Sequence, residues 1–315
     1  MIYEFALDPE LVARWYDPME WAFFRDAFGW ETGRVGAVYP QKWDRQVIKA
    51  FLAHTHADKD SSAFRRLEAR LSDLMSRAVK RESTFAELPN WLEKAEAECG
   101  ERPFRGILSL SNPRGRPEVM TPDDLFSERP PPEWRIPPNP VPPRNAQELA
   151  EAVTPLLRCC RQCVFVDPHL NPIEPRYANV LKALLGVLDD SRCIVRNHKL
   201  DIFVGEGKVG GAMVLRRFEN WLPQCVPPGM RVTVTVLRER PSREKLHNRY
   251  LLTDRGGVIF GVGLDEEDEA GHGQTDDLCR LSSEQWTKRW GDYVSAREST
   301  FCIAAGPAEI ASRSG

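Results

Sequence analysis

The sequence predicts an α/β protein, in which a mainly parallel sheet flanked by helices follows a helix-rich N-terminal module. Three observations support this prediction. Helical and strand patterns alternate over residues 145–305, residues 1–127 carry mostly helical patterns, and a proline-rich segment at 128–144 separates the two regions. Residues 306–315 are expected to form a tail.

Apolar residues at helical spacing predict the elements of the N-terminal module. Residues 8–28 carry aromatic side chains at this spacing, and residues 61–81 place an apolar stripe after a serine N-cap. We expect a third helix over 85–98 and a strand over 104–111. The stripe of the second helix consists of Phe64, Leu67, Leu71, Leu74 and Ala78.

Four tryptophans of this module, Trp15, Trp21, Trp30 and Trp43, have two interpretations. Large aromatic side chains in a helical module are expected to form its core. The alternative is that they dock a protein partner, since aromatic residues are enriched at interfaces.

Residues 128–144, "ERPPPEWRIPPNPVPPR", are expected to form neither helix nor sheet. Proline lacks a backbone donor and favours the extended polyproline II conformation. The segment is therefore predicted to be a linker, or a strap that lies on a domain surface.

The second half of the chain alternates between the two kinds of pattern, which favours an α/β domain. Helices are expected over 145–160, 176–188, 211–222 and 282–294, and strands over 163–170, 192–204, 230–239, 245–254, 258–264 and 299–305. In such folds functional groups gather at the carboxyl ends of the parallel strands.

Composition limits the possible functions. With 42% hydrophobic and 28% charged residues, the chain has the composition of a soluble globular protein, and a net charge of −3 excludes one that coats nucleic acid by bulk charge. No apolar run is long enough to span a membrane, and no basic region precedes an apolar stretch at the start, so we expect a cytoplasmic protein. The eight cysteines are expected to be reduced.

The stretch "KLHNRYLLTD" predicts a phosphate site. His247 and Arg249 are two residues apart on an expected strand, so they project from the same face. Asp254 follows at the turn, and Gly261 and Gly263 lie on one side of the next strand, where they would leave a flat backbone shelf for a ligand. A guanidinium grips phosphate oxygens and an imidazole can attack or protonate, so a histidine, an arginine and such a shelf make a candidate phosphate seat.

Further residues around this stretch are predicted to bind the substrate. Asp167 and His169 follow a buried strand, where sites collect in α/β folds. Residues 238–249 hold five basic against two acidic side chains, so they could receive phosphate groups, or form a solvated loop with internal ion pairs. The predicted substrate-binding residues are Asn248, Gly261, Gly263, Asp167, His169, Arg243 and Lys245.

The pattern His247-x-Arg249-x4-Asp254 resembles the HxKx4D signature of the phospholipase D superfamily, with arginine in place of lysine. "CVFVDPHL" looks like an early strand of that family. "HNRYLLTD", "GVGLD" and "TDDLCRLSSEQWTKRW" are similar to a branch that includes the C-terminal phospholipase-D-like domain of microtubule-interacting-and-trafficking proteins and bacterial defence-associated relatives. The resemblance covers about residues 145–305.

This resemblance implies a phospholipase-D-like fold and a function. Active members use two such motifs, one histidine attacking phosphorus and the other protonating the leaving group, without a metal or another cofactor. Because one motif is visible here, the resemblance implies a homodimer that brings two His247 side chains together. It implies catalytic roles for His247, for Arg249, which would clamp the phosphoryl oxygens, and for Asp254, which would support the site. It predicts a nuclease or phosphodiesterase acting on nucleic acid or another phosphodiester, in a bacterial defence setting. The alternative is a noncatalytic adaptor that binds nucleic acid, anionic lipid or a protein partner.

Two other clusters could hold a metal. His54, His56 and Asp58 resemble the first ligands of the metallo-β-lactamase fold, although Lys59 stands where a second histidine is expected. Cys159, Cys160 and Cys163 form a cluster with no second CxxC or nearby histidine pair. We expect a polar turn at the end of a helix in the first case and buried thiols in the second.

Overall fold

The computed structural model describes residues 1–81, 85, 87–136, 139–190, 193, 199–267, 273–295 and 297–312. The chain divides into two compact units, Ile2–Ile136 and Pro137–Gly315, the second of which also includes Met1. Each unit buries apolar clusters made from its own residues. The division falls inside the proline-rich segment that the sequence predicts to separate two regions.

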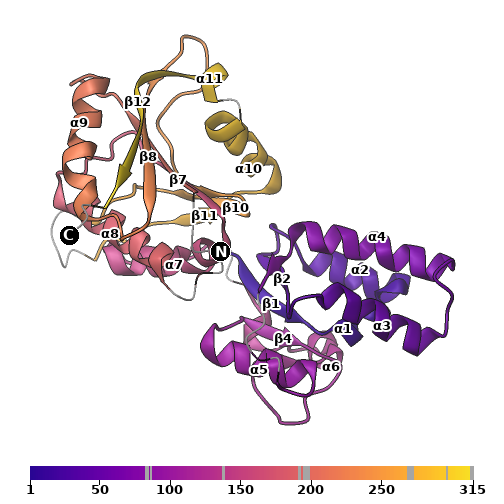
Figure 1. Cartoon of the computed structure of the whole chain (residues 1–315). Coiled ribbons are helices and arrows are strands. Elements are labelled where there is room, and N and C mark those ends of the chain that lie inside the picture. Colours follow the sequence, from indigo (N-terminus) through magenta and orange to yellow (C-terminus); the bar gives the residue numbers. More distant parts are fainter. Residues whose placement is uncertain are drawn as a thin grey trace. The chain divides into compact units, whose positions relative to one another are not determined.

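The N-terminal unit contains a five-stranded sheet of order β3-β2-β1-β4-β5, in which each neighbouring pair is parallel (Figure 1). Its strands are β1 (Tyr3–Leu7), β2 (Arg34–Val38), β3 (Val79–Lys80), β4 (Gly106–Leu108) and β5 (Val119–Met120). Its helices are α1 (Pro9–Ala13), α2 (Pro18–Ala27), α3 (Trp43–Thr55), α4 (Ser62–Arg77), α5 (Trp91–Glu101) and α6 (Pro122–Phe126). The unit is rich in helix as predicted, but β4 is the one strand of this sheet that the sequence pattern predicts.

Local capping explains where these helices begin. Residues 8–28 form two helices because Asp17 accepts hydrogen bonds from the amides of Met19 and Glu20, and Pro18 starts α2 where no amide donor is needed. Ser61 caps α4 as predicted, and the stripe that starts at Phe64 is buried. These two caps fix the helices that cover the core.

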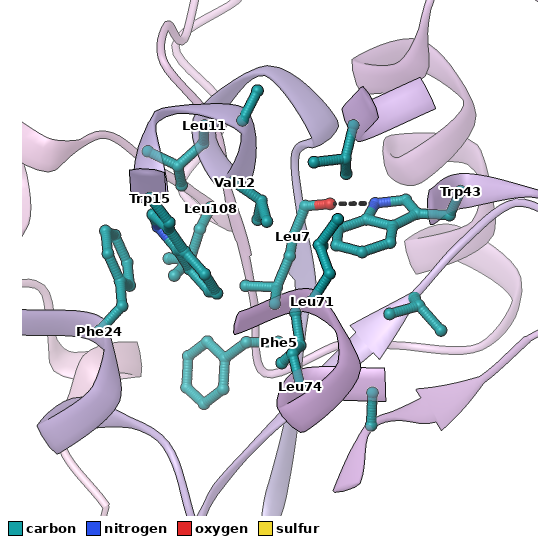
Figure 2. Packing of buried hydrophobic residues seen from close by; sticks show 14 of the residues in the cluster. Phe5, Leu7, Leu11, Val12, Trp15, Phe24, Trp43, Leu71, Leu74 and Leu108 are labelled. Atoms are coloured by element: carbon teal, nitrogen blue, oxygen red, sulfur yellow. Dashed lines mark hydrogen bonds between the residues drawn. The ribbon is translucent and has the colours of Figure 1, made fainter. Parts of the chain in front are cut away.

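Figure 2 shows this core, in which Phe5 and Leu7 of β1 pack among side chains of α1, α2 and α4. The indole Nε1 of Trp43 donates a 2.7 Å hydrogen bond to the carbonyl of Leu7. Trp15 and Trp43 are each 1% exposed, so they are core residues, while Trp21 and Trp30 are half-buried.

The C-terminal unit contains a seven-stranded sheet of order β11-β10-β9-β6-β7-β8-β12 (Figure 1). Its strands are β6 (Gln162–Val166), β7 (Lys199–Gly205), β8 (Arg231–Glu239), β9 (Arg249–Thr253), β10 (Gly256–Phe260), β11 (Leu278–Arg280) and β12 (Phe301–Ala311). Its α-helices are α7 (Ala146–Cys159), α8 (Pro175–Asp189), α9 (Gly211–Trp221), α10 (Ser283–Trp290) and α11 (Arg297–Thr300).

The α/β class is confirmed, and the pairing adds detail to it. The central strands β6, β7 and β8 are parallel, whereas β9, β10, β11 and β12 join them in antiparallel pairs. The sheet is therefore mixed. Residues 306–311, expected to be a tail, instead continue β12, which pairs with β8 as far as Ala311. Part of the strand expected over 192–204 lies outside the described residues.

The described residues on either side of 137–138 in the proline-rich segment each contact the unit to which they belong. Trp134 is buried in the core of the N-terminal unit, where Arg34 lies 4.0 Å from its ring. In the C-terminal unit the carbonyls of Pro140 and Pro142 accept hydrogen bonds from Leu278 and Asp276. Residues 128–144 are thus a strap along most of their length. None of the helices in the described ranges is both long and apolar enough to cross a lipid bilayer.

Candidate functional site

Strand directions bring most of the predicted site residues to one edge of the C-terminal sheet. The parallel strands β6, β7 and β8 end there, β9 begins there at Arg249, and β10 ends there at Phe260. The candidate site therefore comprises the end of β6, the loop 240–248, the start of β9 and the loop 261–265. This is the edge where α/β sheets place their ligands.

Arg249 lies at the centre of this edge, between β6 and β10. Its Nε is 3.9 Å from Oδ1 of Asp167, which is too long for a hydrogen bond. The same Nε is buried without a hydrogen-bond partner in the described chain, while the side chain as a whole is 28% exposed. The charge of Asp167 thus holds the guanidinium at the surface, and its N–H groups make no hydrogen bond within the described chain.

Asp167 is fully buried beside Arg249. Its Oδ1 accepts a 2.8 Å hydrogen bond from the amide of His169, and its Oδ2 accepts a 2.9 Å hydrogen bond from the amide of Leu264. Burial raises the pKa of Asp167, although the two amides and Arg249 favour its charged form. Asp167 therefore fixes the start of the His169 loop and the loop after β10, so its role at this edge is to position other groups.

The glycines after β10 do not form an open shelf for a ligand. A Cβ on Gly261 would lie 2.9 Å from Oδ1 of Asp276, and a Cβ on Gly263 would lie 2.6 Å from Oδ1 of Asp265. The Cβ on Gly263 would also lie 3.5 Å from Oδ2 of Asp167. The space that we predicted for a ligand is therefore occupied by the protein's own carboxylates.

These carboxylates form a buried layer beneath the loop. Asp265 forms ion pairs with Arg144 at 2.8 Å and with Arg176 at 3.4 Å. Asp276 is 1% exposed, and its Oδ1 accepts a hydrogen bond from the amide of Val262. Burial raises the pKa of Asp276, opposed by amide hydrogen bonds from this loop. The loop amides point inward, so they do not make an anion-binding nest at the surface.

His247 and His169 are exposed at the same edge. No hydrogen bond orients the imidazole of His247 within the part of the chain that the structure describes. Asn248, predicted to bind the substrate, donates instead to the hydroxyl of Tyr250 at 2.8 Å, and Tyr250 belongs to the core on the opposite face of β9 from Arg249. Asn248 is therefore directed away from the candidate site.

The basic stretch 238–249 is largely paired internally. Arg238 binds Glu206 through two hydrogen bonds of 2.5 and 2.8 Å, and Lys245 lies 2.8 Å from Glu239. Arg240 donates to the carbonyls of Phe301 and Glu298. Arg243 is exposed and has no ion-pair partner among the described residues. The interpretation as a loop with internal ion pairs fits all of this stretch except Arg243 and Arg249.

Asp254 lies at the other end of β9. Its Oδ1 accepts hydrogen bonds from the amides of Arg161 and Gln162 at the start of β6, at 2.8 and 3.2 Å. Because β6 and β9 are antiparallel, the whole of β9 separates Asp254 from His247. The structure thus places Asp254 apart from the other predicted site residues, at the amino edge of the sheet, where it caps free amides.

Neither alternative metal cluster is assembled. His54, His56 and Asp58 are exposed around the end of α3, as expected for a polar turn. Cys159, Cys160 and Cys163 are buried, and a hydrogen bond with Cys163, together with burial, raises the pKa of Cys160. Among the described residues, no group of three or more potential ligands is placed to hold a metal ion.

Several residues of the buried layer escaped sequence reasoning. Arg144 is separated from Asp265 by 121 positions, so no local pattern connects them. Tyr177 in the first turn of α8 is buried near Asp167 and Asp265, and burial with these two carboxylates raises its pKa to about 12. One sequence signal did point to this layer. The two glycines and the aspartate of "GVGLD" indicate a loop whose backbone lies close to carboxylate groups.

Comparison with known proteins assigns no family to the chain. No family model and no curated protein matches it. Among solved structures, a similar chain is TrmBL2, described as an archaeal chromatin protein with a novel mode of DNA binding. It is 11% identical, the match covers 76% of this chain and 72% of that chain, and the TM-score is 0.28. At that score the likeness supports no conclusion about fold or function.

Proposed function

We propose that the C-terminal unit binds a phosphodiester at the carboxyl edge of its sheet, and that Arg249 is the main contact. The observation that carries this proposal is the state of the Arg249 side chain, which is 28% exposed at the edge of the sheet while its buried Nε lies 3.9 Å from the carboxylate of Asp167. The terminal Nη donors, rather than the buried Nε, would bind the phosphate oxygens. The resemblance to the phospholipase D superfamily supports the same site.

The groups around Arg249 fit this role. Asp167 holds the guanidinium near the edge and fixes the loops on either side of it. Arg243 is exposed on the loop that borders the edge, where it would add positive charge to attract a polyanion, and the exposed imidazoles of His247 and His169 are available for hydrogen bonds to it. Nucleic acid is the ligand class we favour. We also propose that the protein is cytoplasmic and acts in bacterial defence, and these two proposals are based on the sequence alone.

Binding to short single-stranded and double-stranded oligonucleotides, in excess EDTA and at two salt concentrations, tests the proposal. We expect Arg249→Ala to weaken binding about tenfold or more and Arg249→Lys to restore part of it. Arg238→Ala is the matched control, because Arg238 is an arginine near the end of β8, at the same edge of the sheet, that Glu206 already neutralises. Equal affinities for wild type and Arg249→Ala would refute the role of Arg249.

Catalysis is a further step of this proposal and requires a second copy. One neutral His247 would attack phosphorus and form a phosphohistidine, while the second, protonated, would give its proton to the departing alcohol oxygen. Water would then attack phosphorus, lose a proton to the second imidazole and release the phosphomonoester, which breaks the N–P bond and restores both histidines. We expect His247→Ala to abolish turnover in EDTA while it leaves binding within about twofold of wild type. Cleavage that stops in EDTA would contradict this mechanism.

A noncatalytic adaptor is the second candidate, and one observation favours it. His247 has no hydrogen-bond partner in the described chain to orient its imidazole, whereas histidines that act on substrates are held by a neighbouring group. An adaptor predicts that wild type binds a phosphodiester but leaves oligonucleotides and lipid vesicles uncleaved at every protein concentration. A turnover rate that rises with dimer concentration would exclude it.

A further inference from the structure

The N-terminal unit carries an open groove of ≈ 640 Å³ between α2 and the end of α6. Its lining includes Met19, Phe23 and Phe126, with two alanines of α2 between them. Glu20 and Asp26 are the charged residues of the lining. The groove lies on the unit that the proposed phosphodiester site does not use, so it calls for a separate explanation.

The apolar lining is unusually exposed. Met19 is 82% exposed and Phe126 is 59% exposed, the two highest values among the large apolar side chains of the described chain. The ring of Phe126 lies 4.5 Å from that of Phe23, which in turn stacks at 6.3 Å on the buried Trp134. The exposed ring is therefore held in place by the core. The groove therefore offers a partner an apolar surface whose shape is fixed before binding.

The charge of the groove selects the kind of occupant. Asp26 already forms two hydrogen bonds with its neighbour Arg25, at 2.7 and 3.1 Å. Glu20 is half-buried, and none of the basic side chains that the structure describes forms an ion pair with it. Burial raises the pKa of Glu20, although Arg14 and His54, neither of which forms an ion pair with it, favour its charged form from further away. A cation brought by an occupant would stabilise this carboxylate.

We propose that this groove docks a short segment of a protein partner in which a large apolar side chain stands next to lysine or arginine. The apolar side chain packs between Met19 and Phe126, and the cation meets Glu20. An acidic peptide or an anionic membrane would place like charges against the same carboxylates. A second copy of this chain is the alternative occupant, and it would be recognised by self-association of the protein.

Selection of random dodecapeptides displayed on phage against the full chain tests the proposal. We expect the recovered peptides to carry an aromatic or aliphatic residue close to lysine or arginine. For synthetic versions, we expect Phe126→Ser and Met19→Ser each to reduce affinity about tenfold, as at a binding hot spot. Glu20→Gln should reduce affinity about threefold and lower its dependence on salt.

Met213→Ser is the matched control, because Met213 is a 49% exposed methionine on α9 of the other unit, and it should leave affinity unchanged. Met19, Phe126 and Met213 are exposed, and Glu20→Gln keeps the size of a half-buried side chain, so thermal unfolding should stay close to wild type. Recovery of no peptide, of acidic peptides, or of peptides that bind Phe126→Ser normally would overturn the proposal. So would self-association of the wild type that Phe126→Ser abolishes, since the groove would then belong to a second copy.

Discussion

At the scale of single residues, the candidate site depends on carboxylates that are buried without full compensation. Asp167 uses both oxygens for amide hydrogen bonds, and Arg249 offsets its charge only at 3.9 Å. Oδ2 of Asp276 is buried with no hydrogen-bond partner in the described chain. Burial disfavours the charged form of such groups, which links the stability of this unit to pH.

Asp276→Asn tests this link. The pKa of Asp276 is raised in the folded chain, so the folded state binds a proton more tightly than the unfolded chain, and ionisation of Asp276 opposes folding. The stabilising effect of the proton is complete below the unfolded pKa, about 4, and is lost as the pH rises through the folded pKa. Asparagine keeps the acceptor for Val262 but carries no charge.

We therefore expect wild type to lose stability relative to Asp276→Asn as the pH rises from 4 to 7. Urea unfolding of both proteins at several pH values in this range measures the difference. An opposite trend, in which wild type gains on the variant with rising pH, would mean that the loop amides stabilise the carboxylate more than burial destabilises it.

At the scale of elements, the loop 261–265 is built around close contacts between backbone and carboxylate. Gly263 is required because a side chain there would enter the space of Asp265, which Arg144 and Arg176 hold in place. The positions of Arg144 before α7 and of Arg176 in the first turn of α8 tie this loop to two helices. The loop is therefore a rigid border of the candidate site.

Gly263→Ala should destabilise the C-terminal unit by about 1–3 kcal/mol, the usual effect of overpacking a buried site. Gly186→Ala is the matched control, because Gly186 lies on an exposed part of α8 with no atom within 4 Å of an added Cβ. In that helix the same substitution should stabilise by about 0.5–1 kcal/mol. Urea unfolding measures both, and a neutral Gly263→Ala would show that Asp265 can move.

The elements also show what sequence patterns reveal. The stripe of α4 and the placing of His247 and Arg249 at one sheet edge follow from helical spacing and strand direction, which are local properties of the chain. Two strands of the N-terminal sheet, β3 and β5, were missed because two residues are too few to display an alternating pattern. The five-residue strands β1 and β2 were missed because consecutive residues of each are buried, so polar and apolar residues do not alternate along them. Asp254 was placed in the same site as His247 because both belong to one sequence motif. A motif gives only the spacing along the chain, and here β9 lies between the two residues, so they are at opposite edges of the sheet.

At the scale of the whole molecule, the chain is two units with separate cores. The cluster around Phe5 and Trp43 draws on residues of the N-terminal unit, and the cluster around Phe203 and Tyr250 draws on residues of the C-terminal unit. The proline-rich composition predicted this division, but not that Trp134 inside the strap belongs to a core. Composition detects the break in secondary structure, while burial depends on partners far away in the sequence.

Separate cores predict that damage to one unit leaves the other intact. Trp43→Phe removes core volume and the 2.7 Å hydrogen bond to the Leu7 carbonyl, so we expect it to destabilise the N-terminal unit by about 2–4 kcal/mol. Hydrogen exchange measured peptide by peptide should show faster exchange in the strands and helices of residues 2–136 and unchanged exchange in residues 137–312. Phe203→Leu, which alters a side chain 1% exposed in the other core, should give the reverse pattern. Faster exchange throughout the chain in either variant would mean that the two units unfold as one, because loss of packing in one core would then be transmitted to the other.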